Sequence, residues 1–382
     1  MVPALVGSVI AMSSPPHLLV SPENLRSTVE KLASFTTRNT LSAGLRESCE
    51  WLAEEFRKIP GIEVELMEYT APKGRRIPED TKVVQVVATL KGRTDRTILI
   101  GGHIDSLNLE VDPKTGRAPG ANDDASGVAV TLEAARVLAT RQWNQTIKFV
   151  AFSGEEQGLL GATALAKRAK AESWKLEAVL NNDTVGSSSN KAGQKDDKRI
   201  RVFSEEGENH QSRELARFLE YVVRQEMKPF DFGIKLVFRR DRFGRGGDHT
   251  PFVMEGFNAV RFIEVHEEYS RQHTPDDLPE HMDFDYLLQV TRANVLCLAS
   301  LADAGLPPTQ VQIKRDQSHD TTVTWAGSPD TEYFVYWRET TSPIWMGRVS
   351  AGRNTSATLK LINKDDHIFA VGAEFGVPVE AK

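Results

Sequence analysis

Residues 97–106 read TILIGGHIDS, an apolar run that passes through two glycines to a histidine and an aspartate. The run Thr97-Ile98-Leu99-Ile100 predicts a β-strand. In open α/β sheets, ligands bind beyond the carboxyl ends of the strands. His103 and Asp105 therefore lie where we expect chemistry to occur.

Apolar periodicity predicts alternating strands and helices around this stretch. An amphipathic helix with an N-terminal cap begins at Ser21-Pro22. Further helices are expected at 45–56, 127–139, 159–168, 211–223 and 284–302, and strands at 62–68, 83–90, 97–100, 147–152, 178–181 and 259–263. This order predicts an α/β fold with a mixed, mostly parallel central sheet flanked by helices.

The chain has 382 residues, which is long for one core, so two folded units are expected. Gly305-Leu306-Pro307-Pro308 has the composition of a linker, and short alternating runs follow it. We expect an N-terminal leader or extension at 1–20, a large domain at 21–306 and a small antiparallel β-sandwich at 307–382. The aromatic residues of this last segment resemble those of a fibronectin type III module.

Composition excludes several classes of function. The net charge of −6 and the lack of a long basic block give no support to nucleic acid binding. No apolar run reaches the roughly 20 residues of a membrane span. The two cysteines, Cys49 and Cys297, fit buried positions in helices, although a disulfide between them stays open. Neither lies in a CxxC motif, so any metal site must use His, Asp and Glu.

Four more polar segments follow strands or occupy loops. They are 119–127 (PGANDDASG), 153–158 (SGEEQG), 181–184 (NNDT) and 271–277 (RQHTPDD). Taken singly, each has an ordinary structural explanation, such as helix capping, a helix dipole or a turn. Together with His103 they supply two His, two Asp and two Glu, the donor types of a paired zinc site.

Physical chemistry suggests roles for some of these residues. An aspartate in the loop at 119–127 can bridge two cations with its two oxygens. One of Glu155 and Glu156 can bind metal while its neighbour takes a proton from metal-activated water. Asp105 can accept a ring N–H of His103 and so fix its tautomer.

The segments at 102–106, 120–127, 155–158, 182–183, 247–252 and 273–275 resemble, in one order, the two-zinc aminopeptidases. This clan includes bacterial leucyl aminopeptidases, aminopeptidase Y and, more distantly, glutamate carboxypeptidase. The resemblance spans roughly residues 21–306. It implies the zinc exopeptidase fold, two Zn²⁺ ions, peptide substrates and hydrolysis of the amino-terminal peptide bond.

Carried over by position, the resemblance implies that His103 and Asp183 hold one zinc ion and that Glu156 and His273 hold the other. Asp123 would bridge them, Glu155 would be the general base, and Asp105 would support His103. The Ser-Asp-His motif of the family is Gly247-Asp248-His249 here, so the motif departs in one position and does not define the detailed shape of the substrate pocket.

Other functions stay open. A loop at 238–248 is rich in arginine and glycine, and Arg245 or Asp248 can contact substrate there. An arginine that binds a terminal carboxylate would favour a carboxypeptidase or dipeptidase instead. A cyclase of amino-terminal glutamine or a non-catalytic adhesion module on the same scaffold are further alternatives.

Location is inferred mainly from the resemblance, which implies a secreted or periplasmic protein. Residues 5–12 are apolar, but they lack the basic residues that precede a signal sequence. The sequence does not define the oligomeric state or the preferred side chain at the cleaved end.

Overall fold

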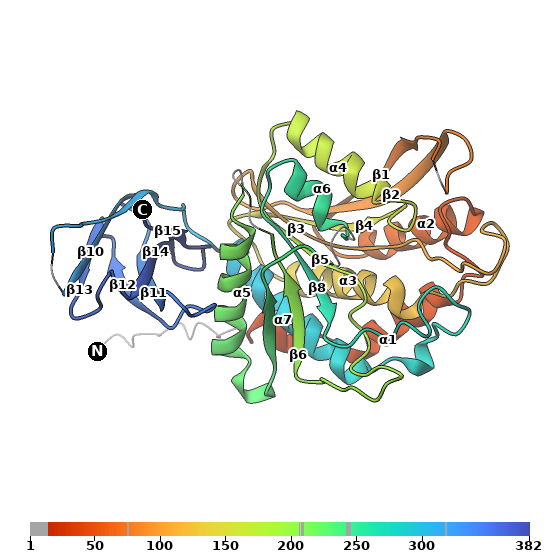
Figure 1. Ribbon diagram of the computed structural model, residues 1–382. Coiled ribbons are helices and arrows are strands. Elements are labelled where there is room, and N and C mark those ends of the chain that lie inside the picture. Colours follow the sequence, from red (N-terminus) through yellow and green to blue (C-terminus); the bar gives the residue numbers. More distant parts are fainter. Residues whose placement is uncertain (1–13, 75, 206, 208–209, 242–245, 318) are drawn as a thin grey trace, which may run out of the picture.

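The computed structural model describes residues 14–74, 76–205, 207, 210–241, 246–317 and 319–382 (Figure 1). The main body contains one eight-stranded sheet in the order β1-β2-β4-β3-β5-β8-β6-β7. Its strands are β1 (Ile62–Ala71), β2 (Thr81–Leu90), β3 (Arg96–His103), β4 (Thr146–Phe152), β5 (Lys175–Asn182), β6 (Arg199–Phe203), β7 (Gly233–Val237) and β8 (Ala259–Glu264).

The sheet is mixed, as the sequence predicts. The four central strands β4, β3, β5 and β8 run parallel to their neighbours in this group. β1 pairs antiparallel with β2, β2 with β4, and β6 with β8, while β6 and β7 are parallel. The parallel centre therefore brings the carboxyl ends of β3, β4, β5 and β8 to the same edge.

Helices cover both faces of the sheet. They are α1 (Pro22–Ala33), α2 (Ala43–Arg57), α3 (Ser126–Leu138), α4 (Leu160–Ala171), α5 (Ser212–Glu226), α6 (His249–Met254) and α7 (Phe284–Ala302). Short 3₁₀ turns lie at Pro16–Leu19, Lys228–Phe230 and Pro279–His281. The larger core packs α1, α2, α3, α5 and α7 on one face, and a second core packs α4 and α6 on the other. The predicted α/β architecture is confirmed.

Three elements of the main body were not expected from the sequence: β6, β7 and α6. β7 has only five residues, none of them fully buried, and α6 is a six-residue helix that begins with polar residues. Such short elements have too few apolar positions to show a period. Pairing of β6 with β8, pairing of β7 with β6, and packing of α6 against α4 define them instead.

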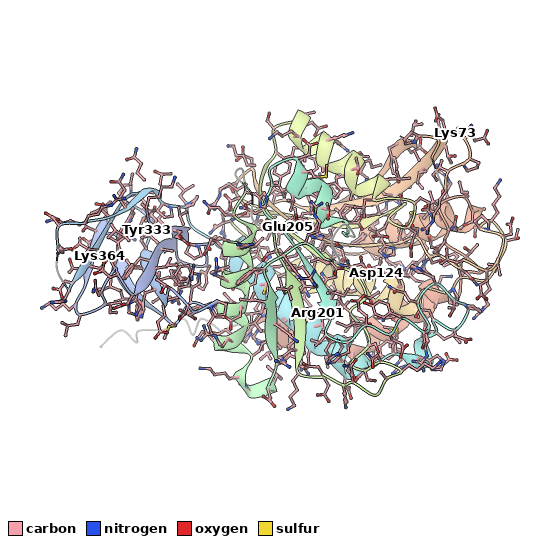
Figure 2. All side chains as sticks on the ribbon, in the orientation of Figure 1. Lys73, Asp124, Arg201, Glu205, Tyr333 and Lys364 are labelled. Carbon is pink, nitrogen blue, oxygen red and sulfur yellow. The ribbon has the colours of Figure 1, made fainter. Side chains whose placement is uncertain are left out.

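Seven strands form a second lobe beside α5 (Figure 1). They are β9 (Thr309–Ile313), β10 (Thr321–Ala326), β11 (Tyr333–Glu339), β12 (Gly347–Gly352), β13 (Ser356–Leu359), β14 (His367–Ala373) and β15 (Val379–Glu380). They make a three-stranded sheet, β13-β10-β9, and a four-stranded sheet, β12-β11-β14-β15. Between these antiparallel sheets lies a core of its own, which includes Tyr333 (Figure 2).

The second lobe contacts α5 through aromatic and arginine side chains. The Tyr221 and Tyr336 rings pack edge to face with centroids 5.6 Å apart. Arg217 donates to the carbonyl of Pro343 at 3.1 Å, and Arg224 donates to the carbonyl of Trp345 at 2.5 Å.

The structure also shows the state of the two cysteines and the length and polarity of the described helices. Cys49 and Cys297 are both buried in the larger core as separate thiols. Within the described residues, every helix is too short or too polar to span a bilayer.

Candidate active site

The candidate residues come from the ends of neighbouring strands. His103 is the last residue of β3, Asp183 directly follows β5, and Glu155 and Glu156 lie in the turn after β4. Asp123 lies in a turn, Ala121–Ala125, that leads into α3, and His273 lies in a turn after β8. Because β4, β3 and β5 are adjacent and parallel, their carboxyl ends bring these side chains to one edge of the sheet.

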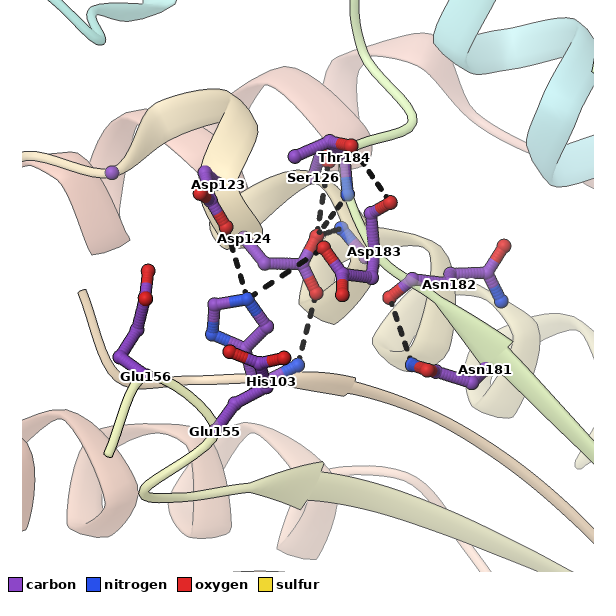
Figure 3. A network of polar contacts seen from close by, with 12 residues as sticks. His103, Asp123, Asp124, Ser126, Glu155, Glu156, Asn181, Asn182, Asp183 and Thr184 are labelled. Atoms are coloured by element: carbon purple, nitrogen blue, oxygen red, sulfur yellow. Dashed lines mark hydrogen bonds and ion pairs between the residues drawn. The ribbon is translucent and has the colours of Figure 1, made fainter. Parts of the chain in front are cut away.

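Asp123 lies at the centre of the donor atoms. Its Oδ1 is 3.0 Å from His103 Nε2, and its Oδ2 is 3.0 Å from His273 Nε2. His273 Nε2 is also 2.9 Å from Glu156 Oε1, and His103 Nε2 is 3.8 Å from Asp183 Oδ1. Two donor groups result, one of His103, Asp123 and Asp183 and the other of Asp123, Glu156 and His273. Figure 3 shows Asp123, Glu156 and Asp183 gathered around His103.

Burial and charge act strongly on these groups. Burial lowers the pKa of His103, but three neighbouring aspartates outweigh it and hold that pKa well above its ordinary value. Burial likewise lowers the pKa of His273, but Asp123 and Glu156 outweigh burial and raise this pKa to about 10. Each imidazole therefore compensates carboxylates that would otherwise lie buried without a counter-charge.

The donor set fits a pair of zinc ions. Zinc accepts imidazole nitrogen and carboxylate oxygen, and a carboxylate with its two oxygens in two donor groups suits a bridging position. Buried carboxylates are costly unless paired or bound to metal. Glu155 belongs to a third donor group, with His103 and Glu156, so its carboxylate lies close to both proposed metal positions.

Asp105 links His103 to the Glu155-Glu156 turn. Its carboxylate accepts the backbone N–H groups of Glu155 at 3.2 Å and Glu156 at 3.3 Å. The acceptor nearest to His103 Nδ1 is the backbone carbonyl of Asp105, at 3.0 Å, whereas the Asp105 carboxylate is 3.6 Å away. Asp105 therefore orients both the histidine and the glutamate turn, through different atoms.

Asp124, in the segment 119–127, has a wider role than that of a helix cap. It accepts the N–H of Gly127 at the start of α3, and also those of His103 and Thr184. A Cβ on Gly102 would lie 2.6 Å from Asp124 Oδ2, so only glycine allows this approach. Asp124 lies inside the main body, where it joins β3, β5 and α3 (Figure 2).

Sequence reasoning missed two residues that hold the site together. Arg38 is fully buried and donates to the carbonyls of Leu32, Ile104, Pro119 and Gly120. It therefore joins the segment after His103 to the segment before Asp123. No local pattern distinguishes such an arginine from a solvated one.

Asp277 is the second of these residues. Its carboxylate accepts the backbone N–H groups of Asn122 at 2.9 Å and Asp123 at 3.0 Å. Burial raises the pKa of Asp277 to about 7. Because Asp277 lies four residues after His273, it ties the His273 turn to the Asp123 turn.

Of the two residues predicted to contact substrate, Arg245 and Asp248, the structure describes only Asp248. Arg245 lies outside the described residues. Asp248 is fully buried, and within the described part of the chain neither of its carboxylate oxygens has a hydrogen-bond partner. Burial raises the pKa of Asp248 well above its ordinary value.

Comparison with known proteins identifies the family. The model of peptidase family M28 matches residues 85–297, which contain all five candidate metal ligands. This chain belongs to peptidase family M28. It is 36% identical over 396 residues to a "Probable zinc metalloprotease" of Leptosphaeria maculans, covering 92% of this chain and 91% of the relative. As an M28 metallopeptidase, it is expected to act on peptides and to use zinc.

Solved structures of low identity share the fold of this M28 chain. LapB of Legionella pneumophila matches with a TM-score of 0.60 and 21% identity, covering 74% of this chain and 72% of LapB. BSAP, a zinc aminopeptidase of Bacillus subtilis, matches with a TM-score of 0.59 and 17% identity, covering 72% of this chain and 94% of BSAP.

Proposed function

We propose that this M28 peptidase is an aminopeptidase that removes single residues from the amino end of peptides and uses two zinc ions. The observation that carries the proposal is the position of Asp123, whose two oxygens lie 3.0 Å from two different histidines. In the proposal His103 and Asp183 hold one ion, Glu156 and His273 hold the other, and Asp123 bridges them.

Zinc held by these residues would supply Lewis acidity for the scissile carbonyl and for the attacking water. Glu155 takes the proton of the attacking water and delivers it to the leaving amine. Burial and the nearby Asp183 and Glu156 carboxylates raise the pKa of Glu155 well above its ordinary value. A raised carboxyl pKa suits a group that must accept a proton and then release it.

The chain supports Glu155 without using its carboxylate. Asp105 accepts the Glu155 N–H, so the main chain fixes the turn and the side chain stays available. Asp105 also contacts His103 Nδ1, which leaves Nε2 on the side of Asp123 and Asp183. The proposed base and the proposed ligand are therefore held by one residue.

The choice of an amino-terminal cleavage site rests on the family motifs and on the solved structures that are named aminopeptidases. The test uses two blocked dipeptides. Hydrolysis of a dipeptide with a free amine and an amidated carboxyl end, without hydrolysis of an acetylated dipeptide, is the expected result. The reverse pattern would indicate a carboxypeptidase, and hydrolysis only when both ends are free would indicate a dipeptidase.

Several predictions from the sequence belong to the same proposal. We propose that 21–306 is the catalytic domain, that 307–382 is a separate module resembling fibronectin type III, and that the protein is secreted or periplasmic. Contact of Asp248 with substrate requires that its buried carboxylate become accessible.

A further inference from the structure

Arg261 is a buried cation beside a proposed metal ligand. It lies within β8 and is 1% exposed. Its Nη2 is 3.0 Å from Asp183 Oδ2, and its Nη1 donates to Asp241 Oδ2 at 2.9 Å and to the carbonyl of Gly246 at 3.0 Å. No motif in the sequence marks Arg261.

The two carboxylate oxygens of Asp183 face different partners. Oδ2 faces Arg261, whereas Oδ1 faces the donor atoms, 3.8 Å from His103 Nε2. Asp123 differs, because both of its oxygens lie against histidines of the donor groups. Asp183 is therefore presented to a metal through one oxygen, and Asp123 through two.

The guanidinium is also held from its other side. Asp241, which is buried too, shares the charge of Arg261, so Asp183 is not its sole counter-ion. A guanidinium is planar and stays charged, so contacts on two sides fix its plane and its position. The Asp183 carboxylate gains a fixed orientation and keeps part of its charge for a cation.

Gly247 provides the space that Arg261 occupies. A Cβ on Gly247 would lie 3.0 Å from Asn181 Oδ1, 3.1 Å from Arg261 Cδ and 3.2 Å from Arg261 Nε, closer than side chains normally pack. This is the position at which the chain has glycine in place of the serine of the family motif. The glycine and the buried arginine therefore form one packing unit.

We propose that Arg261 is a positioning residue that fixes Asp183 as a one-oxygen ligand of one zinc ion, and that Gly247 is required to accommodate it. The proposal rests on the proposed two-zinc site. Partners that orient a metal ligand contribute about 10- to 100-fold to metal affinity. Removing Arg261 should therefore weaken one zinc position and spare the other.

The experiment titrates zinc into chelator-treated full-length protein by calorimetry. The wild type is expected to bind two equivalents. Arg261→Gln should bind one of them about 10- to 100-fold more weakly and the other with unchanged affinity. Arg261→Lys keeps the charge but not the planar fork. Its affinity for the weakened equivalent should lie between those of the wild type and Arg261→Gln.

Gly247→Ala tests the same proposal with Arg261 present. It should weaken the same equivalent as Arg261→Gln, by a smaller factor. If Arg261→Gln fails to fold, which circular dichroism would show, Gly247→Ala and Arg261→Lys carry the test.

Arg96→Gln is the matched control. Arg96 pairs with Glu177 at 2.5 Å in the same sheet, at the opposite end of β3 from His103. It should leave both zinc equivalents unchanged.

The role of Arg261 is overturned if Arg261→Gln binds zinc with unchanged affinity, or if it binds zinc more tightly, which would show that Arg261 competes with the metal. Equal weakening of both equivalents would also overturn it. A wild type that binds fewer than two equivalents would instead refute the proposed two-zinc function.

Discussion

Replacement of Glu155 by glutamine separates its two possible roles. Glu155 lies close enough to His103 and Glu156 to be a metal ligand, yet we propose that it is the general base. Glutamine has nearly the same shape, and the turn is held by the Glu155 main-chain N–H on Asp105, which the substitution leaves in place. The variant therefore changes the proton acceptor and little else.

The size of the effect follows from that role. A positioned general base contributes about 100- to 10,000-fold to the rate, which corresponds to about 2.7–5.5 kcal/mol of activation free energy. We expect kcat to fall by this factor. Zinc content should stay at two ions per chain, because the two donor groups that share Asp123 do not include Glu155.

The assay measures kcat and KM on an amidated dipeptide together with zinc content by atomic emission. Glu156→Gln is the matched control, since it alters the neighbouring carboxylate and should lose zinc as well as activity. Activity of Glu155→Gln within tenfold of the wild type would refute the role of base. Loss of zinc from Glu155→Gln would show that Glu155 is a ligand.

Three further predictions concern stability, measured by urea unfolding. Burial and the charge of Arg261 lower the pKa of His249 to about 3, so His249 stabilises the fold above its unfolded pKa of about 6.5, and this contribution declines as the pH falls toward 3. Between pH 7.5 and pH 5 the unfolding free energy of the wild type should therefore fall by about 2 kcal/mol through His249. This loss should be absent from His249→Asn, and equal pH dependence in both proteins would contradict the prediction. Addition of zinc at a hundredfold excess over the Kd of each site should raise the unfolding free energy of chelated protein by about 2.7 kcal/mol per ion, or about 5.4 kcal/mol for two ions, and no increase would contradict zinc binding to the folded state. Ser106→Ala removes a buried hydroxyl that accepts the Arg38 N–H at 3.0 Å and donates to the carbonyl of Ala118 at 2.7 Å; it should lower the unfolding free energy by about 1–3 kcal/mol, and an unchanged value would show that water replaces it.

Many helices and strands of the main body can be predicted from local sequence patterns. The apolar period predicts the helix at 284–302 with the bounds that α7 has, and the central strands within a few residues. Such periods are readable because each buried face repeats along one element. β7, with five residues of which none is fully buried, and α6, with six residues in all, offered no period to read.

The supporting residues of the site could not be predicted. Arg38, Arg261 and Asp277 are buried charges whose partners lie far away in sequence. A charged residue is normally a surface residue, so composition and spacing assign each of them to solvent. Only the folded chain shows that they orient the segments that carry Asp123 and Asp183.

The sequence by itself determined the donor types, their placement after strands, and the order of motifs that marks the family. Those features are properties of short segments, so they can be read from the sequence before the fold is known. The tertiary structure decided which oxygen of which carboxylate faces which histidine. That choice depends on contacts of about 3 Å between distant segments, set by strand pairing and by buried charges such as Arg261, and no local pattern encodes it.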